Sequence, residues 1–270
     1  MIDLHCHLLP GIDDGAEDLE QSLEMARLSV ADGVTVIACT PHIFPGVYNN
    51  SGPDIRGHVA RLQSEFDAAQ IAIRLVTGGD VHVAPDLVSK LNCGEALSLN
   101  DSRYVLVEPP HHILPPNIEG LFFNLLTAGY VPIVTHPERM SWIDRDYDIL
   151  VRLVRSGAWM QITAGAVLGK FGSRAKGWSE RLLHDGMVHI VASDAHDAVH
   201  RPPAMKEAFR ALRSLVGEEE AMNLVQIRPE AILNDRAPAS APDLPIREGS
   251  VYENNEETLW DRVSRYFRAS

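Results

Sequence analysis

Short runs of apolar, often β-branched residues recur along the chain and alternate with longer segments in which apolar residues follow a helical spacing. The runs cover residues 2–5, 34–39, 73–77, 104–107, 131–135, 159–163 and 188–192. Each run has the length of one buried strand, and each intervening segment is long enough for a crossover helix. The alternation predicts seven parallel strands, each followed by a helix.

The helical segments carry their own start and stop signals. Glu17 and Asp18 place carboxylates at the positive end of the first helix, and Gly33 ends it. Apolar stripes are expected to face the sheet. Their residues are Leu19, Leu23, Ala26 and Val30; Ile55, Val59, Leu62 and Phe66; Ile118, Leu121, Leu125 and Leu126; Ile149, Leu150, Leu153 and Val154; and Leu182 and Leu183. The pattern predicts an α/β fold, a distorted (β/α)7 TIM-like barrel, with a doubly wound open sheet as the alternative.

The composition changes after about Asn234. Residues 236–250 are rich in Pro, Ala and Ser, which is typical of a linker. A short amphipathic helix is then predicted from Leu259, Trp260, Val263, Tyr266 and Phe267, with Arg262, Arg265 and Arg268 interleaved. We expect this helix to pack on its own barrel or on a neighbouring subunit, with binding to a partner or a membrane surface as the alternative. The predicted division is therefore a barrel over residues 1–234 and a linker with a helix over 235–270.

Composition and charge narrow the class of protein. The chain has 270 residues, of which 45% are hydrophobic, so it can bury a sizeable core. No apolar run is long enough to span a bilayer, and the start lacks a basic segment followed by an apolar one. We therefore expect a chain without a leader, in the cytoplasm. The net charge of -13 argues against a binder of duplex nucleic acid.

The three cysteines, Cys6, Cys39 and Cys93, are widely spaced and form no Cys-x-x-Cys motif. They predict neither a disulfide framework nor a thiolate zinc site, and we expect buried free thiols. None of them is followed by an arginine six positions later, so the thiolate loop of the cysteine phosphatases is absent.

Histidines and carboxylates follow six of the predicted strands. Since side chains alternate along a strand, the two histidines of His5-Cys6-His7 should lie on one side, although this motif alone is a weak signal for a metal. Taken singly, each later residue has an ordinary alternative, as a loop histidine, an ion-paired glutamate or a helix-capping aspartate. The full set is His5, His7, Asp14, His42, Asp80, Glu108, His136, Asp194 and His196.

Together these residues predict a metal centre, because the carboxyl ends of parallel strands meet at one end of a barrel. Burying their four carboxylates without cations would cost several kcal/mol apiece. Nine donors exceed the three or four protein ligands of one catalytic zinc ion, so with bridging carboxylates they could hold two or three ions. Imidazole and carboxylate ligands without sulfur suit manganese, iron or zinc.

Arg139 and Arg201 lie just beyond two of the ligand segments. If the bound cations carry more charge than the four carboxylates, the centre stays positive and would attract a phosphate dianion. The planar guanidinium groups could then bind its oxygens in a bidentate manner. The alternative for both arginines is an ordinary surface ion pair.

Seven short segments carry a resemblance to a known family. They are Asp3-Leu4-His5-Cys6-His7, Asp13-Asp14-Gly15, Thr40-Pro41-His42, Asn100-Asp101-Ser102-Arg103-Tyr104, His136-Pro137-Glu138-Arg139, Ser193-Asp194-Ala195-His196 and Arg201-Pro202-Pro203. In order and spacing they resemble the polymerase and histidinol phosphatase (PHP) superfamily, above all its bacterial branch of metal-dependent protein-tyrosine phosphatases for capsular polysaccharide. The likeness covers about residues 1–234.

The resemblance implies a trinuclear, manganese-type site held by the nine residues above, with Arg139 and Arg201 binding phosphate. It implies removal of phosphate from the tyrosine-rich tail of a bacterial tyrosine kinase that controls polysaccharide export, with membrane contact only through that partner. A homo-oligomer remains open. The family usually has glutamate where this chain has Asp80, whose shorter side chain could reach one ion where glutamate bridges two. His82 could compensate, although an uninvolved histidine is the simpler interpretation.

The expected mechanism is in-line attack on phosphorus by a metal-bound hydroxide, without a phosphoenzyme. Three other hypotheses remain. A small-molecule phosphatase, for example one acting on histidinol phosphate, could use the same site. A dinuclear amidohydrolase commonly carries a carbamylated lysine at its fourth strand, where this chain has Glu108. A non-catalytic, metal-binding regulator of polysaccharide assembly is the third.

Overall fold

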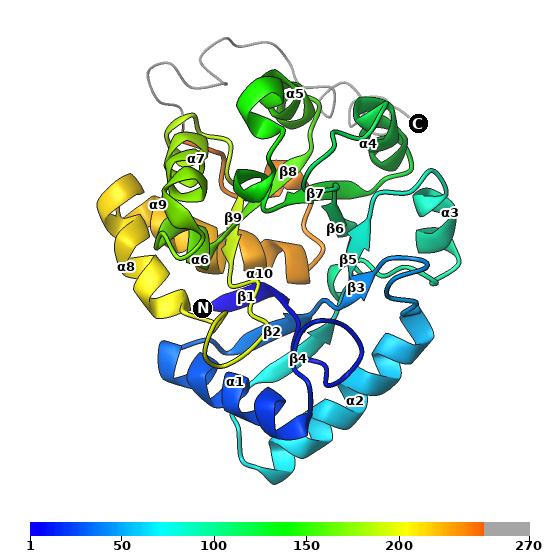
Figure 1. The fold of residues 1–270 in the computed structure, drawn as a ribbon, viewed down its shortest axis with the longest axis vertical. Helices are drawn as coiled ribbons and strands as arrows, with labels where there is room; N and C mark the ends of the chain where they lie inside the picture. Colours follow the sequence, from blue (N-terminus) through cyan, green and yellow to red (C-terminus); the bar gives the residue numbers. More distant parts are fainter. Residues whose placement is uncertain (246–270) are drawn as a thin grey trace.

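Strands and helices alternate along the chain, and every ladder between neighbouring strands is parallel (Figure 1). The structure is a computed structural model and describes residues 1–245. One sheet has the order β1-β2-β4 and consists of β1 (Ile2–Cys6), β2 (Val36–Cys39) and β4 (Arg74–Thr77). The other has the order β3-β5-β6-β7-β8-β9 and consists of β3 (His42–Ile43), β5 (Asp80–His82), β6 (Tyr104–Glu108), β7 (Val131–Thr135), β8 (Trp159–Thr163) and β9 (Ile190–Ala192). The prediction of a parallel α/β fold is confirmed.

The two sheets are linked by strands that break and resume after two intervening residues. β2 and β4 pair with each other, and their continuations β3 and β5 pair in the second sheet. Glycines allow the close approach at the second break: a Cβ on Gly78 would lie 2.9 Å from Thr40 Cγ2, and one on Gly79 would lie 2.6 Å from Ile43 Cδ1. The described residues therefore form three strands in one sheet and six in the other, where the sequence predicted seven in one.

β1 also meets the end of β9. The Asp194 N–H donates to the His5 carbonyl at 2.8 Å, and the His7 N–H donates to the Ala195 carbonyl at 2.9 Å. These bonds curl the parallel sheets toward each other and bring the ends of the first and last strands into contact. Residues almost two hundred positions apart thus meet at the carboxyl ends of the strands.

Helices surround the curled sheets, most of them on the outer face (Figure 1). They are α1 (Leu19–Asp32), α2 (Gly52–Ala68), α3 (Leu87–Asn92), α4 (Ile118–Thr127), α5 (Ile143–Arg155), α6 (Ala164–Val167), α7 (Gly172–His184), α8 (Met205–Val216), α9 (Glu218–Met222) and α10 (Arg228–Leu233). The predicted stripe of α2 is buried in full. The stripe predicted for α1 is partly wrong, because Leu19 and Val30 are 37% and 40% exposed. Small residues pack there instead: Ser22 and Ser29 are buried and donate their hydroxyls to main-chain carbonyls.

Two apolar clusters lie on opposite faces of the strands. Val105 of β6 belongs to the outer cluster with Leu125 of α4, and the next residue, Leu106, belongs to the inner cluster with Ile232 of α10. This alternation is the period-two pattern of a strand buried on both faces. α10 therefore packs into the inner face of the curled sheet.

The first part of the predicted linker lies against the rest of the molecule. Arg228, completely buried at the start of α10, donates to the carbonyls of Pro242 and Asp243 at 2.9 and 2.7 Å. The amphipathic helix predicted near the C-terminus lies outside the described residues, and the division at residue 234 stays a prediction. None of the helices in residues 1–245 combines the length and the apolar character needed to cross a membrane.

The cysteines are free, as predicted, but not all are buried. Cys6 and Cys39 are buried, whereas Cys93 is exposed. Cys93 follows the short helix α3 at a surface turn, so the expectation of a buried thiol is wrong there. Burial raises the pKa of Cys6 well above its usual value, so this thiol is a poor nucleophile.

Candidate metal centre

The centre begins at the carboxyl end of β1, where a β-bulge changes the direction of the side chains. The register with β2 shifts between Asp3 and Cys6. Leu4 packs in the inner cluster and Cys6 in the outer one. His5 and His7 point to one side, with their Nε2 atoms 3.2 Å apart. Both imidazoles are thereby presented to the same space.

The far nitrogen of each imidazole is held by a polar partner. His5 Nδ1 lies 2.9 Å from Gln161 Oε1 on β8, and His7 Nδ1 lies 2.7 Å from Asp13 Oδ2. Ligand histidines are commonly oriented in this way, because a hydrogen bond at Nδ1 leaves the Nε2 lone pair free for a cation.

The loop after β1 folds back tightly over the strand. A Cβ on Gly15 would lie 2.1 Å from the His7 carbonyl oxygen, so only glycine fits there. The fold-back brings Asp14 Oδ1 to 3.3 Å from His42 Nε2 and 3.5 Å from His196 Nε2. Glycine therefore places the neighbouring aspartate in the centre.

Two of the predicted ligands adopt the left-handed backbone conformation within two residues of the ends of their strands. His136 has φ 32° after β7, and Asp194 has φ 51° after β9. Such residues each cost on the order of 1–3 kcal/mol and gather at functional sites. In this conformation Asp194 turns Oδ1 to 3.4 Å from His5 Nε2, while its carbonyl oxygen lies 3.0 Å from His196 Nδ1.

The predicted ligands form overlapping donor sets, in each of which the donor atoms lie within 4.8 Å of one another. The sets are His5, His7 and Asp80; His5, His136 and Asp194; His7, Asp14, His42 and His196; His42, Asp80 and Glu108; and Glu108, His111 and His136. The structure brings all nine predicted residues together, and shared donors are what a site for several ions requires. Their coordination of ions stays a prediction.

The burial of Asp80 and its lack of hydrogen-bond partners are what a cation ligand in this centre requires. Its side chain is completely buried, and among the described residues neither carboxylate oxygen has a hydrogen-bond partner. Oδ2 lies 3.5 Å from His5 Nε2 and 3.4 Å from His42 Nδ1. A buried carboxylate is costly without compensation, and a divalent ion between these donors would supply it. Despite its short side chain, Asp80 belongs to two donor sets.

The carboxylates also change the protonation of the imidazoles. Burial opposes the charged form of His7, but Asp13 outweighs it and raises the pKa of His7 to about 9. Burial likewise opposes protonation of His42, yet Asp14 and Asp80 raise its pKa to about 11. Metal ions would therefore have to displace a proton from the imidazole of His7 and from that of His42.

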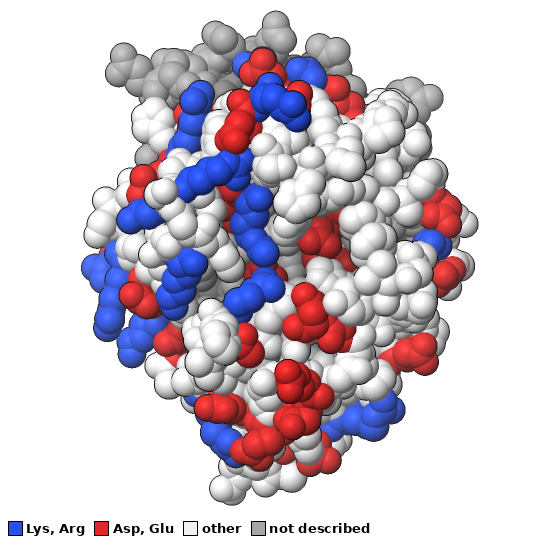
Figure 2. All heavy atoms as spheres, in the orientation of Figure 1, with Lys and Arg blue, Asp and Glu red and all other residues white. Residues whose placement is uncertain are grey.

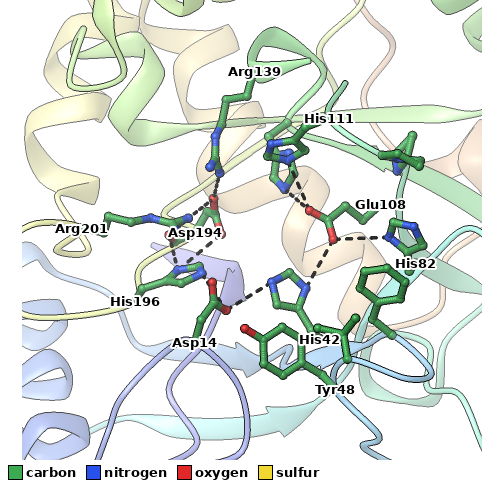
Figure 3. Close-up of a pocket in the computed structure, with 15 residues that line it drawn as sticks. Asp14, His42, Tyr48, His82, Glu108, His111, Arg139, Asp194, His196 and Arg201 are labelled. Atoms are coloured by element: carbon green, nitrogen blue, oxygen red, sulfur yellow. Dashed lines mark hydrogen bonds and ion pairs between the residues drawn. The ribbon is translucent and has the colours of Figure 1, made fainter. Parts of the chain in front are cut away.

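Arg139 and Arg201 meet on one oxygen of Asp194 (Figure 3). Arg139 Nη1 lies 2.6 Å and Arg201 Nη2 2.7 Å from Asp194 Oδ2. Both guanidinium groups lie near the ring of Phe171, with their Cζ atoms 4.6 and 5.8 Å from its centroid. The side chains are only 19% and 24% exposed, so neither arginine forms an ordinary surface ion pair.

A pocket of about 500 Å³ opens above the donor sets, and one of its walls is apolar. Phe44 stacks on His82, with ring centroids 3.9 Å apart, and Tyr48 stacks on His42 at 5.3 Å. Val47, which precedes Tyr48 in the sequence and also lines the pocket, is 58% exposed. Pro109 and Pro110 also line the pocket. The pocket thus combines a charged floor with a wall that can contact an apolar group.

Charge divides the face that carries the pocket. Basic side chains form a band along one side of the hollow, and acidic side chains lie within it and over α1 (Figure 2). In the close-up, Arg139 and Arg201 lie on one side, and Glu108 lies on the other (Figure 3). A bound anion would therefore sit between the arginines and the donor sets.

Four residues of the centre were missed from the sequence. Asp13 adjoins a predicted ligand, and its position in Asp13-Asp14-Gly15 could have indicated a supporting role. His111 is three residues beyond Glu108 and could have been considered on that ground. Gln161 and Phe171 gave no sequence signal, because only the fold brings them to His5 and the arginines.

A curled parallel sheet with histidines and carboxylates gathered at the carboxyl ends of its strands, beside a pair of arginines, defines a metal-dependent hydrolase as the class of this protein. Residues 1–234 match the family described as capsular polysaccharide synthesis, CpsB/CapC, and the chain belongs to this family. The resemblance inferred from the seven sequence segments is confirmed.

Two relatives illustrate the similarity. The chain is 35% identical over 252 residues to the tyrosine-protein phosphatase YwqE of Bacillus subtilis strain 168, covering 93% of this chain and 99% of the relative. It is 30% identical over 243 residues to the tyrosine-protein phosphatase CpsB of Streptococcus pneumoniae, covering 87% and 99%.

Solved structures agree. A match among structures described as YwqE from Bacillus subtilis and CpsB from Streptococcus pneumoniae, unique metal-dependent tyrosine phosphatases, has a TM-score of 0.85 and 36% identity. It covers 92% of this chain and 100% of that one. A histidinol phosphate phosphatase from Lactococcus lactis, with a TM-score of 0.53, 15% identity and coverage of 83% and 94%, shares the fold alone.

Proposed function

We propose that this protein is a metal-dependent protein-tyrosine phosphatase that hydrolyses phosphotyrosine on a bacterial tyrosine kinase regulating capsular or exopolysaccharide synthesis. One observation carries the proposal above the others. Asp194 directs one carboxylate oxygen toward ligand histidines and the other toward two arginines. Cation-binding and anion-binding groups therefore adjoin within one pocket, as the hydrolysis of a phosphate monoester requires.

The nine predicted ligands would hold two or three divalent ions, with Mn²⁺ as the first choice and iron or zinc as alternatives. When bound, such ions would make water a stronger nucleophile at neutral pH and offset the charge of the phosphate. Gln161 and Asp13 fix the orientation of His5 and His7, so the donor atoms are in place before any ion arrives.

The arginines would bind the phosphoryl oxygens. Their planar groups already converge on Asp194, and Phe171 supports both from one side. Bidentate hydrogen bonds from two guanidinium groups would orient the phosphate and stabilise the charge that develops on its oxygens. The apolar wall around Val47 would contact the ring of a phosphotyrosine.

The proposal has three further features: the barrel, the location of the protein and its assembly. We infer that β2 with β3, and β4 with β5, each fill one position of a distorted (β/α)7 barrel. We place the protein in the cytoplasm, where its contact with the membrane would be through the kinase alone, and a homo-oligomer is compatible with this role.

The deciding experiment measures hydrolysis of a phosphotyrosine peptide by metal-free protein supplied with Mn²⁺, Fe²⁺ or Zn²⁺, with His136→Ala as the inactive control. We expect turnover with at least one metal. Faster turnover of small esters such as histidinol phosphate would favour a small-molecule phosphatase. Bound metal without hydrolysis of any phosphate ester would favour a non-catalytic regulator.

A further inference from the structure

His111 belongs to one of the donor sets but has no part in the function proposed above. It follows β6 by three residues, in a loop that hydrogen bonds hold in place. The Ser141 N–H and hydroxyl donate to the His111 carbonyl at 2.8 and 3.2 Å, and Trp142 Nε1 donates to the Pro110 carbonyl at 2.9 Å. The main chain at His111 is thus fixed against the segment that follows Arg139.

The imidazole of His111 faces the centre. Its Nε2 is buried and has no hydrogen-bond partner among the described residues. This nitrogen lies 3.4 Å from Glu108 Oε1 (Figure 3). The ring centroid is 5.1 Å from that of His136. A buried nitrogen without a partner, directed at a carboxylate that belongs to two donor sets, needs either a proton to share or a cation to bind.

We propose that His111 is a tenth metal ligand, which holds one divalent first-row cation together with Glu108 and His136. This inference rests on the metal dependence of the proposed function. One donor atom from each of the three residues lies within 4.8 Å of the others. Ligands about 2.0–2.2 Å from a common ion lie at most about 4.4 Å apart, so small side-chain shifts would suffice.

Two imidazoles and one carboxylate form a set known from catalytic zinc sites, and they leave positions open for water or substrate. Glu108 also belongs to the set with His42 and Asp80. It would therefore join the cation of His111 to a neighbouring one. Loss of His111 should weaken one ion strongly and its neighbours much less.

The other histidines near Glu108 do not share these features. His82 Nδ1 is 3.9 Å from Glu108 Oε2, its ring is stacked on Phe44, and it belongs to none of the donor sets among residues 1–245. His112 is exposed, and it does not line the pocket. His112 is therefore a matched control, adjacent in sequence and of the same chemistry.

The experiment compares His111→Ala, His111→Gln and His112→Ala with the unmodified protein. It measures metal binding and does not measure turnover of a substrate. Metal-free proteins are titrated with Mn²⁺ and Co²⁺; bound metal is counted by elemental analysis after dialysis, and the visible spectrum of Co²⁺ reports its ligands. We expect both His111 variants to lose one ion, or to bind it at least about tenfold more weakly, with an altered Co²⁺ spectrum. His112→Ala should match the unmodified protein.

Glutamine separates coordination from hydrogen bonding, because its amide can still donate to Glu108 but is a poor ligand. Unchanged stoichiometry, affinity and spectrum in His111→Ala would overturn the proposal. Recovery of normal affinity in His111→Gln would overturn it as well and assign a hydrogen bond to His111. Circular dichroism and melting of the metal-free variants establish that each has folded. An unmodified protein that binds no metal would overturn the proposed function itself.

Discussion

Arg228 and Asp80 are both completely buried, yet their charged groups differ in their hydrogen-bond partners. Arg228 donates to both carboxylate oxygens of Glu220 at 2.7 and 3.0 Å, and to two carbonyls of residues 242 and 243. The carboxylate of Asp80 accepts no hydrogen bond from any described residue. Hydrogen bonds thus satisfy Arg228, whereas Asp80 has only the nearby imidazoles of His5 and His42, at 3.5 and 3.4 Å.

The two charged groups also lie at opposite ends of the strands. Arg228 also donates to the carbonyl of His189, directly before β9 begins, at 3.4 Å. Asp80 begins β5, just beyond the carboxyl end of β4, and belongs to two of the donor sets. Arg228, near the amino end of β9, thus has its hydrogen bonds made within the fold, whereas Asp80, among the proposed ligands, accepts none from the described residues. Five predictions test this division.

Metal removal should have the largest effect, and it should act on the carboxyl end alone. Because the ions supply several kcal/mol of transition-state stabilisation, chelation should lower turnover of a phosphotyrosine peptide by about a thousandfold or more. Added Mn²⁺ should restore it. Cys6→Ser should retain activity, since no thiolate takes part. A chelator-resistant activity that Cys6→Ser abolishes would contradict the proposed mechanism.

Glu220→Ala should destabilise the amino end. It leaves Arg228 buried without its carboxylate, which costs about 3–5 kcal/mol in the free energy of unfolding. Urea titration measures the loss, and Glu219→Ala, at an exposed neighbour, is the control. Activity per folded molecule should stay unchanged. A large drop in that activity would show that the two ends are coupled.

Asp80→Asn should have the opposite effects. Metal affinity and activity should fall about a hundredfold, because a carboxylate shared by two donor sets is lost. The stability of the metal-free protein should change by less than about 1 kcal/mol, since the burial cost of the carboxylate offsets its attraction to protonated His42. Unfolding curves and metal titrations measure both, with exposed Asp148→Asn as the control. Strong destabilisation would make Asp80 a structural residue.

The pH dependence should distinguish metal-free from metal-loaded protein. The folded-state pKa of His7 is about 9, above the ordinary value of 6.5, chiefly through Asp13 against the opposing effect of burial. Protonated His7 therefore stabilises the metal-free fold fully below pH 6.5, and this contribution is lost as the pH rises through about 9. Melting temperatures between pH 6 and pH 10 should show this decline, and saturating Mn²⁺ or Asp13→Asn should reduce it. A flat profile for the metal-free protein would contradict it.

Phe171→Leu should have the smallest effect. The ring lies under Arg139 and Arg201, and a cation–π contact contributes about 0.5–2 kcal/mol. We expect kcat/KM to fall by about two- to tenfold, with most of the change in KM, because the arginines lose a support and not a charge. Phe171→Tyr should retain activity, and Phe123→Leu at an exposed position of α4 is the control. A loss as large as that of Asp80→Asn would give Phe171 a larger role.

Much of the site could be predicted because strand order fixes where strand ends meet. The parallel runs placed nine side chains at one end of the sheet, and the structure brings all nine into overlapping donor sets. Less could be predicted for the helices. Leu19 and Val30 indicated the wrong face of α1, because the buried face there accepts Ser22 and Ser29, whose hydroxyls bond to main-chain carbonyls.

The sequence by itself determined the parallel α/β architecture, the set of candidate ligands and the family, since all three depend on local pattern and order along the chain. Tertiary structure decided the short strands β3 and β5 that bring the described residues to nine strands, the bulge between Asp3 and Cys6, and the contact of two arginines with one oxygen of Asp194. It also decided which buried charge is satisfied. Glu220 is near Arg228 in sequence, but the carbonyls beyond residue 240 reach that arginine only through packing. Long-range contacts set these features, and no local spacing encodes them.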